Sequence, residues 1–158
     1  MSSAEVPARV FAMDVGAGTT DILLTRPGQP LENAVKLVVP SRTQVVAAQI
    51  EQATARGQAI VFYGPTMGGG ACAAAARRHL AAGLPLLATE EAALTFSDNL
   101  VRIQESGVTL VGESELTARL GALPQGSVVL RSGDVPPEAL GASLALLGAD
   151  REFDAVAV

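Results

Sequence analysis

The residues with the clearest chemical potential form one short stretch near the N-terminus. It runs Asp14, Val15, Gly16, Ala17, Gly18, Thr19, Thr20 and Asp21. Glycines in a tight turn permit positive φ angles, so several backbone N–H groups can converge into an anion-binding concavity. Thr19 and Thr20 add hydroxyl donors, and a carboxylate such as Asp14 is best explained beside phosphates as a water-mediated ligand of Mg²⁺. The stretch therefore predicts a phosphate site with its metal.

Two other kinds of glycine-rich phosphate site are excluded by the residues that follow. A dinucleotide fingerprint needs a third glycine and then a helix, but Asp21 takes that position and a strand follows. A P-loop needs a lysine directly after its glycines, and Lys36 follows no such segment. The alternatives left open are a plain β-hairpin with a glycine turn and an Asp21 that only satisfies turn amides.

A second glycine loop covers residues 64–70 and ends with Gly68, Gly69 and Gly70. It leads into an alanine-rich helix expected from Ala71. Unpaired N–H groups at a helix start carry partial positive charge and favour a nearby anion. These three glycines are therefore candidates for contact with a cofactor, with a flexible turn into the helix as the equal alternative.

Three further residues are interpreted as structural. His79 has no partner at metal-ligand spacing and is expected on the solvated surface. Cys72 has no neighbouring base in the sequence and is expected to be a small buried side chain. Asp134, which precedes two prolines, is interpreted as a turn or cap residue.

The predicted elements position both loops. Apolar runs at 9–14, 21–25 and 34–39 predict three antiparallel strands in a meander. Further strands are predicted at 59–63, 84–88, 108–111, 127–131 and 153–158, and helices at 41–56, 71–82, 90–106 with a break near Ser97, 114–120 and 137–147. A meander followed by alternating helices and strands is typical of a ribonuclease-H-like α/β fold with one mixed sheet.

Composition limits the class of protein. The 158 residues are 49% hydrophobic and 17% charged, which fits one folded domain with a real core. The net charge of −5 and the absence of a basic cluster argue against nucleic acid as a partner. No apolar run approaches the roughly 18 residues of a membrane helix, and no secretory pattern opens the chain. We therefore expect a cytoplasmic protein that does not enter a membrane.

The stretch from Asp14 to Asp21 is similar to the phosphate-1 and phosphate-2 loops of the actin-like ATPase and sugar-kinase superfamily. The resemblance implies that the loop holds the β- and γ-phosphates of ATP and that Asp14 supports Mg²⁺. The step from Gly68–Gly70 into Ala71 resembles the adenosine loop of the same superfamily. In that superfamily a second lobe closes over the nucleotide. Residues 1–158 are therefore expected to be a single N-terminal lobe, whose partner is a missing C-terminal lobe or a second copy.

Both loops together with residues 89–93 also resemble an uncharacterised prokaryotic family sometimes labelled pyruvate formate-lyase activating. That label implies a radical enzyme whose 4Fe-4S cluster needs three cysteine thiolates, and this chain has Cys72 alone. We expect the family without that activity. The leading hypothesis is the nucleotide-binding lobe of an ATPase or kinase of unknown acceptor. The alternatives are a non-catalytic module that binds a nucleotide or phosphorylated metabolite, and a relic without a ligand, because fold alone does not decide function.

Overall fold

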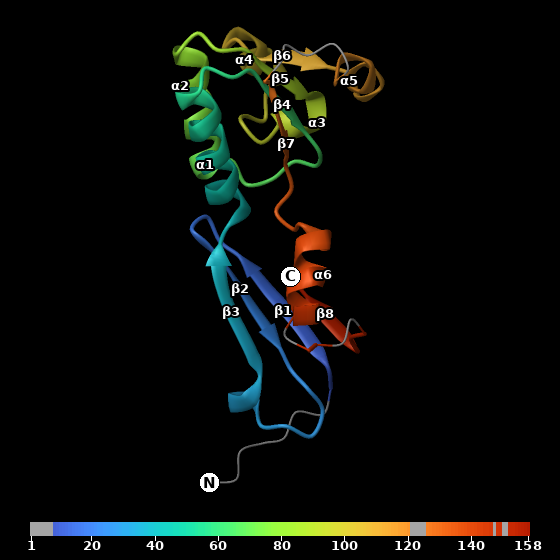
Figure 1. The fold of residues 1–158 in the computed structure, drawn as a ribbon. Helices are drawn as coiled ribbons and strands as arrows, with labels where there is room; N and C mark the ends of the chain where they lie inside the picture. The colour runs from blue at the N-terminus through green and yellow to red at the C-terminus, as the bar shows by residue number, and fades with distance from the viewer. Residues whose placement is uncertain (1–7, 121–125, 147, 150–151) are drawn as a thin grey trace. The chain divides into compact units, whose positions relative to one another are not determined.

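The computed structural model describes residues 8–120, 126–146, 148–149 and 152–158. The elements, in chain order, are β1 (Val10–Val15), β2 (Thr19–Leu24), a 3-10 turn η1 (Leu31–Asn33), β3 (Val35–Pro40), α1 (Arg42–Ala55), β4 (Ile60–Tyr63), α2 (Gly70–Ala81), β5 (Leu86–Thr89), α3 (Glu90–Ala93), α4 (Leu100–Glu105), β6 (Thr109–Val111), α5 (Glu113–Leu120), β7 (Val128–Arg131), α6 (Pro137–Leu146) and β8 (Ala155–Ala157) (Figure 1). The predicted mixed α/β class is confirmed, and the predicted helix break near Ser97 separates α3 from α4.

These elements form two compact units, and each unit has its own sheet. The first unit is Met1–Ser41 with Val135–Val158, and the second is Arg42–Asp134. The strand orders are β3-β2-β1-β8 and β6-β5-β4-β7, so the expectation of one continuous mixed sheet is wrong. The reason is that β8 pairs in parallel with the free edge of β1, which leaves no place there for β4. A ribonuclease-H-like topology within one actin-like lobe stays a prediction.

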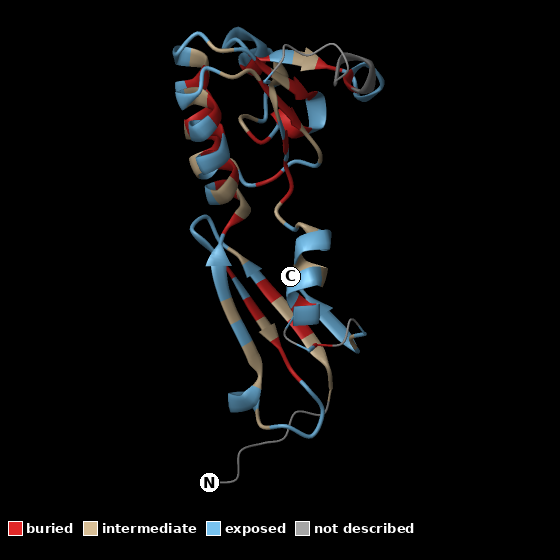
Figure 2. Cartoon of the chain, viewed as in Figure 1, coloured by how far each residue is buried: buried red, intermediate tan, exposed pale blue. Residues whose placement is uncertain are grey.

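The first unit is a three-strand meander extended by β8. β1 pairs antiparallel with β2, and β2 pairs antiparallel with β3, as predicted. Strand alternation places Phe11, Met13, Ile22 and Leu24 on one face, where they form a core with Leu144 of α6. Figure 2 shows this alternation as buried and exposed bands along β1 and β2. The other face carries the charged side chains discussed below.

The second unit is a parallel sheet packed with helices. β4 lies between β5 and β7 and pairs in parallel with both. Ile60, Val61 and Phe62 of this central strand are fully buried, because a parallel strand with crossover helices is covered on both faces. The main core of the unit also includes Val46 and Ile50 of α1.

Within the described segments, no helix is both long enough and apolar enough to cross a lipid bilayer.

Candidate functional site

Hydrogen bonds fix the conformation of the turn between β1 and β2. The Gly16 N–H donates to the Thr19 carbonyl oxygen at 2.9 Å. Ser41, which follows β3 and is buried, donates its hydroxyl to the Ala17 carbonyl at 2.9 Å and its N–H to the Gly18 carbonyl at 3.1 Å. The turn is therefore anchored to the end of β3 through its carbonyl groups.

The two glycines of the turn play different parts. Neither Gly16 nor Gly18 has a positive φ angle, so the expected left-handed geometry is not what these glycines provide. A Cβ atom at Gly16 would lie 3.0 Å from the Thr19 carbonyl oxygen, which is the acceptor of its own hydrogen bond. A Cβ atom at Gly18 would meet no atom within 4 Å. A side chain at Gly16 would crowd the turn, whereas Gly18 leaves bare backbone facing open space.

Two carboxylates stand directly opposite each other beside this turn. Asp14 on β1 pairs in register with Asp21 on β2, and both residues are exposed. Like charges directly opposite each other on paired strands are destabilising, and their Cβ atoms lie about 5 Å apart. Asp21 accepts a hydrogen bond from the Thr19 hydroxyl at 3.1 Å. Within the described residues, the Asp14 carboxylate has no such partner. Carboxylate oxygens are suitable ligands for a hydrated divalent cation such as Mg²⁺.

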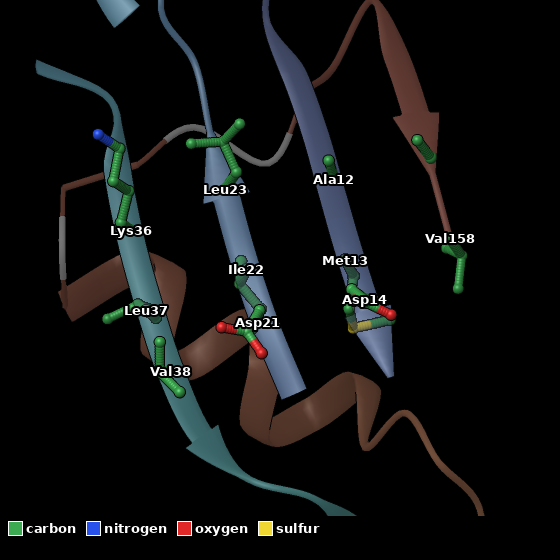
Figure 3. Close-up of a pocket in the computed structure, with 11 residues that line it drawn as sticks. Ala12, Met13, Asp14, Asp21, Ile22, Leu23, Lys36, Leu37, Val38 and Val158 are labelled. Carbon is green, nitrogen blue, oxygen red and sulfur yellow. The ribbon is translucent and has the colours of Figure 1, made fainter. Parts of the chain in front are cut away.

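The carboxylates lie at one end of a hollow of about 490 Å³ on the face of the first sheet opposite to α6 (Figure 3). Its walls include Leu23, Val38 and Val158, and Lys36 lies at the other end of the hollow from Asp14 and Asp21. Sequence reasoning did not select Lys36 as a site residue. The strand pattern could have indicated it, because Lys36 and Val38 lie two residues apart and so share one face of β3. Val38 pairs in register with Asp21, which brings Lys36 to the same face as the carboxylates.

The two threonines predicted to bind phosphate do not lie in equivalent surroundings. Thr19 is exposed, and its hydroxyl is already donated to Asp21. Thr20 is 6% exposed and pairs with Val15 across the hairpin. Of the two hydroxyls, the Thr19 hydroxyl is therefore the one that a ligand at the turn reaches without displacing the core.

The second glycine loop is tied down by packing and hydrogen bonds within its own unit. A Cβ atom at Gly69 would lie 2.4 Å from the Thr95 carbonyl oxygen, a distance that no side chain tolerates. Gly70 has a φ angle of +35°, which also favours glycine. A Cβ atom at Gly68, by contrast, would meet only the Asp134 carboxylate at 3.8 Å. Packing and conformation thus account for Gly69 and Gly70 without any ligand.

Two of the N–H donors around the start of α2, those of Gly68 and Cys72, have side-chain partners. Thr43 of α1 donates its hydroxyl to the Gly69 carbonyl at 2.7 Å, and the Thr43 hydroxyl oxygen accepts from the Cys72 N–H at 3.1 Å. The Gly68 N–H donates to the Asp134 carboxylate at 3.2 Å, so Asp134 is bonded to the second glycine loop, and its interpretation as a turn or cap residue stays a prediction. A phosphate at Gly68 would have to displace a negative charge. The assignment of Gly68, Gly69 and Gly70 to a cofactor stays a prediction that this geometry does not favour.

The expectation that His79 lies on the surface is wrong. Its side chain is fully buried between α1 and the segment after α2. Its Nε2 lies 3.1 Å from the Pro85 carbonyl oxygen, and its Nδ1 lies 2.9 Å from the Thr54 hydroxyl. A carbonyl only accepts, so Nε2 carries a hydrogen. His79 is a hydrogen-bonded core residue, and no sequence pattern indicated its two partners.

Cys72 is buried, as expected. Burial raises the pKa of its thiol from 9.0 to about 12, so the thiolate that would bind a metal or cluster is strongly disfavoured. Among the residues that the structure describes, no three His, Cys, Asp or Glu side chains gather as a metal site. The surroundings of Cys72 do not fit the cluster of a radical enzyme.

Comparison with known proteins gave one family. The profile of the family described as "Putative pyruvate format-lyase activating enzyme (DUF1786)" matches residues 67–158, which is more than half of the chain. The comparisons with curated proteins and with solved structures gave no match. The matched segment begins within the second glycine loop, and it contains α2, the three following strands β5, β6 and β7, and the whole C-terminal part of the first unit. The chain belongs to this family.

Proposed function

We propose that the β1–β2 turn binds the phosphates of a nucleotide, ATP by resemblance, with Mg²⁺ held by Asp14 and Asp21, in a protein of the actin-like ATPase and sugar-kinase superfamily. The observation that carries the proposal is the pair of opposed, exposed carboxylates beside a glycine turn. Such a pair is unfavourable by itself and becomes favourable when a cation lies between the two groups. The phosphoryl acceptor is unassigned.

The turn offers three groups to such a ligand. Gly18 faces open space and lets a phosphate approach the backbone closely. The Thr19 hydroxyl is exposed at the same tip and can turn from Asp21 to a phosphate oxygen. The bound metal neutralises the carboxylates that would otherwise repel the phosphates. In this arrangement the chain's residues bind and orient the phosphates, and the metal supplies charge neutralisation.

One observation favours a second candidate, a non-catalytic module for a phosphorylated metabolite. In the superfamily the second glycine loop contacts the adenosine, but here the Gly68 N–H is bonded to Asp134 and Gly69 packs against Thr95. A ligand recognised by the hairpin without a base-binding loop would be a phosphate compound of any kind. The two candidates therefore differ in whether the adenine contributes to affinity.

Calorimetry with the purified chain tests both candidates. ATP in the presence of Mg²⁺ is expected to bind, and Asp14→Asn is expected to weaken that Mg²⁺-dependent binding by about tenfold or more while the fold stays intact, because charge is removed but shape is kept. Pyrophosphate with Mg²⁺ separates the candidates: affinity equal to that of ATP favours the metabolite module.

Glu32 provides a matched control, because it is an exposed acid on η1 and does not line the hollow. Glu32→Gln is expected to leave binding unchanged. Equal ATP affinity of the wild type and Asp14→Asn would contradict the metal assignment, and no binding of ATP or pyrophosphate would contradict the phosphate site itself.

A further inference from the structure

A second cavity lies wholly within the second unit, on α2 and α4. Its volume is about 170 Å³, and its lining comprises Ala73, Ala76, Arg77, Leu80, Phe96, Ser97, Arg102, Ile103, Ser106 and Val108. The four lining residues from α2 fall at positions i, i+3, i+4 and i+7, which is one face of the helix. The apolar residues at the base of the cavity are held by the core. Ala76, Ile103 and Val108 are buried, and Phe96 stacks on Phe62 with 5.0 Å between ring centroids.

Two arginines from different helices line this cavity. Arg77 comes from α2 and Arg102 from α4, and both are exposed. In the described part of the chain, neither guanidinium group has a hydrogen-bond or ion-pair partner. The lining contains no acidic residue, although the chain as a whole has 16 acidic residues against 11 basic ones. Two guanidinium groups that share a cavity lining without an acidic residue are an electrostatic arrangement that an anion completes.

The neighbouring residue Arg78 differs from Arg77 in having an ion-pair partner within the protein. It follows Arg77 on α2 but turns to α1, where it forms an ion pair with Glu51. One of the two adjacent arginines is thus neutralised within the protein, and the other is left at the cavity. The same chain therefore supplies both a candidate ligand-binding arginine and a matched control.

We propose that this cavity binds a small organic carboxylate, whose apolar body lies against Phe96, Leu80 and Ile103 and whose carboxylate is held by Arg77 and Arg102. The planar guanidinium group matches a carboxylate through two parallel hydrogen bonds. The apolar floor selects an anion that carries a hydrocarbon part over an inorganic one. The volume is below the roughly 300–1,000 Å³ of pockets for drug-sized ligands, so the ligand is compact. This site is independent of the phosphate site proposed for the hairpin.

Sodium benzoate is a suitable probe, because it combines a carboxylate with a compact ring. Titration of the purified chain, followed by NMR shifts of backbone amides, is expected to show saturable shifts at Phe96, Ser97 and Ser106. Benzamide, the neutral analogue, is expected to bind at least tenfold more weakly, which corresponds to about 1.4 kcal/mol. Inorganic phosphate is expected not to compete at concentrations that saturate with benzoate.

Substitutions of the three arginines test which of them contact the carboxylate of benzoate. Arg77→Gln and Arg102→Gln are each expected to weaken benzoate binding about tenfold, and Arg78→Gln is expected to leave it unchanged. All three residues are exposed, so the fold is preserved. Any of four results would overturn the proposal. These are no saturable shifts with benzoate, equal binding of benzamide, an equal loss in Arg78→Gln, and competition by phosphate at equal concentration, which would show a simple anion site.

Discussion

At the scale of single residues, the two glycines of the hairpin separate structural need from ligand binding. Gly18→Val is expected to leave the free energy of unfolding within about 0.5 kcal/mol of the wild type, because its Cβ meets open space and its φ angle is not positive. The same change is expected to abolish binding of ATP with Mg²⁺, because the side chain fills the approach to the backbone.

Gly16→Val is the comparison for that variant. Its Cβ would press on the Thr19 carbonyl oxygen at 3.0 Å, so we expect a loss of about 1–3 kcal/mol in stability. Urea denaturation and calorimetry on both variants provide the measurements. Unchanged nucleotide affinity in a folded Gly18→Val protein would count against the hairpin as the phosphate site.

Cys72 gives a prediction about pH. Its thiol has a pKa of about 12 in the folded chain against 9.0 for the free group, so above pH 9 the unfolded chain loses this proton while the folded chain keeps it. Stability is therefore expected to fall as pH rises from 9 toward 12, by at most about 1.4 kcal/mol per pH unit from this group. Urea denaturation at pH 8 and pH 10.5 measures the fall, and Cys72→Ala is expected to show a smaller one. Equal falls in both proteins would mean that the thiol does not titrate differently on folding.

The sequence indicated which residue types could form a site, but it did not indicate which residues contact each other in the fold. Glycine, threonine and aspartate in one short stretch were enough to select the hairpin as a candidate site. The opposition of Asp14 and Asp21 could have been predicted as well, since a two-strand register follows from the turn length. The bond between Thr54 and His79 spans 25 positions and the bond from Thr43 to Gly69 spans 26, and local sequence patterns carry no information on such pairs.

At the scale of elements, the second glycine loop sets how α2 starts. Gly69→Ala is expected to cost about 1–3 kcal/mol, because a Cβ at this position would lie 2.4 Å from the Thr95 carbonyl and force the loop or α2 to shift. Gly68→Ala is the control, since its Cβ would come no closer than 3.8 Å to another atom and the Asp134 carboxylate can give way. Thermal unfolding of both variants is the measurement. A Gly69→Ala protein as stable as Gly68→Ala would show that the loop adapts freely.

Element order was predicted well because the periodicities were strong. The alternation of apolar residues in β1 and β2 and the helical spacing of α1 each identified the element to within a few residues. The division into two sheets was not predicted. Pairing between strands far apart in the sequence, such as β1 with β8, depends on which edges are free, and the pattern within each strand does not encode that choice.

At the scale of the whole molecule, the first sheet leaves apolar side chains exposed at both of its edges. In the described sheet β3 and β8 have one neighbouring strand each. Val38 on β3 is 67% exposed, and Val156 and Val158 at the other edge are 63% and 84% exposed. Unpaired edges with apolar side chains favour pairing with another chain. A symmetric pair of molecules is the simplest way to cover them.

We therefore expect the purified chain to self-associate and to be a poor ATPase. The carboxylates and Gly18 are exposed, so a nucleotide bound there lacks the enclosure that aligns an attacking group and excludes water. Sedimentation equilibrium across a concentration series is expected to show a monomer–dimer equilibrium, and Val156→Lys is expected to shift it toward monomer because a charge on an edge strand opposes pairing. Phosphate release is expected to stay below about 1 s⁻¹, the lower end of ordinary enzymes. A chain that stays monomeric at every concentration and turns over faster than this would show that the first sheet needs no partner and that the exposed hairpin is a complete active site.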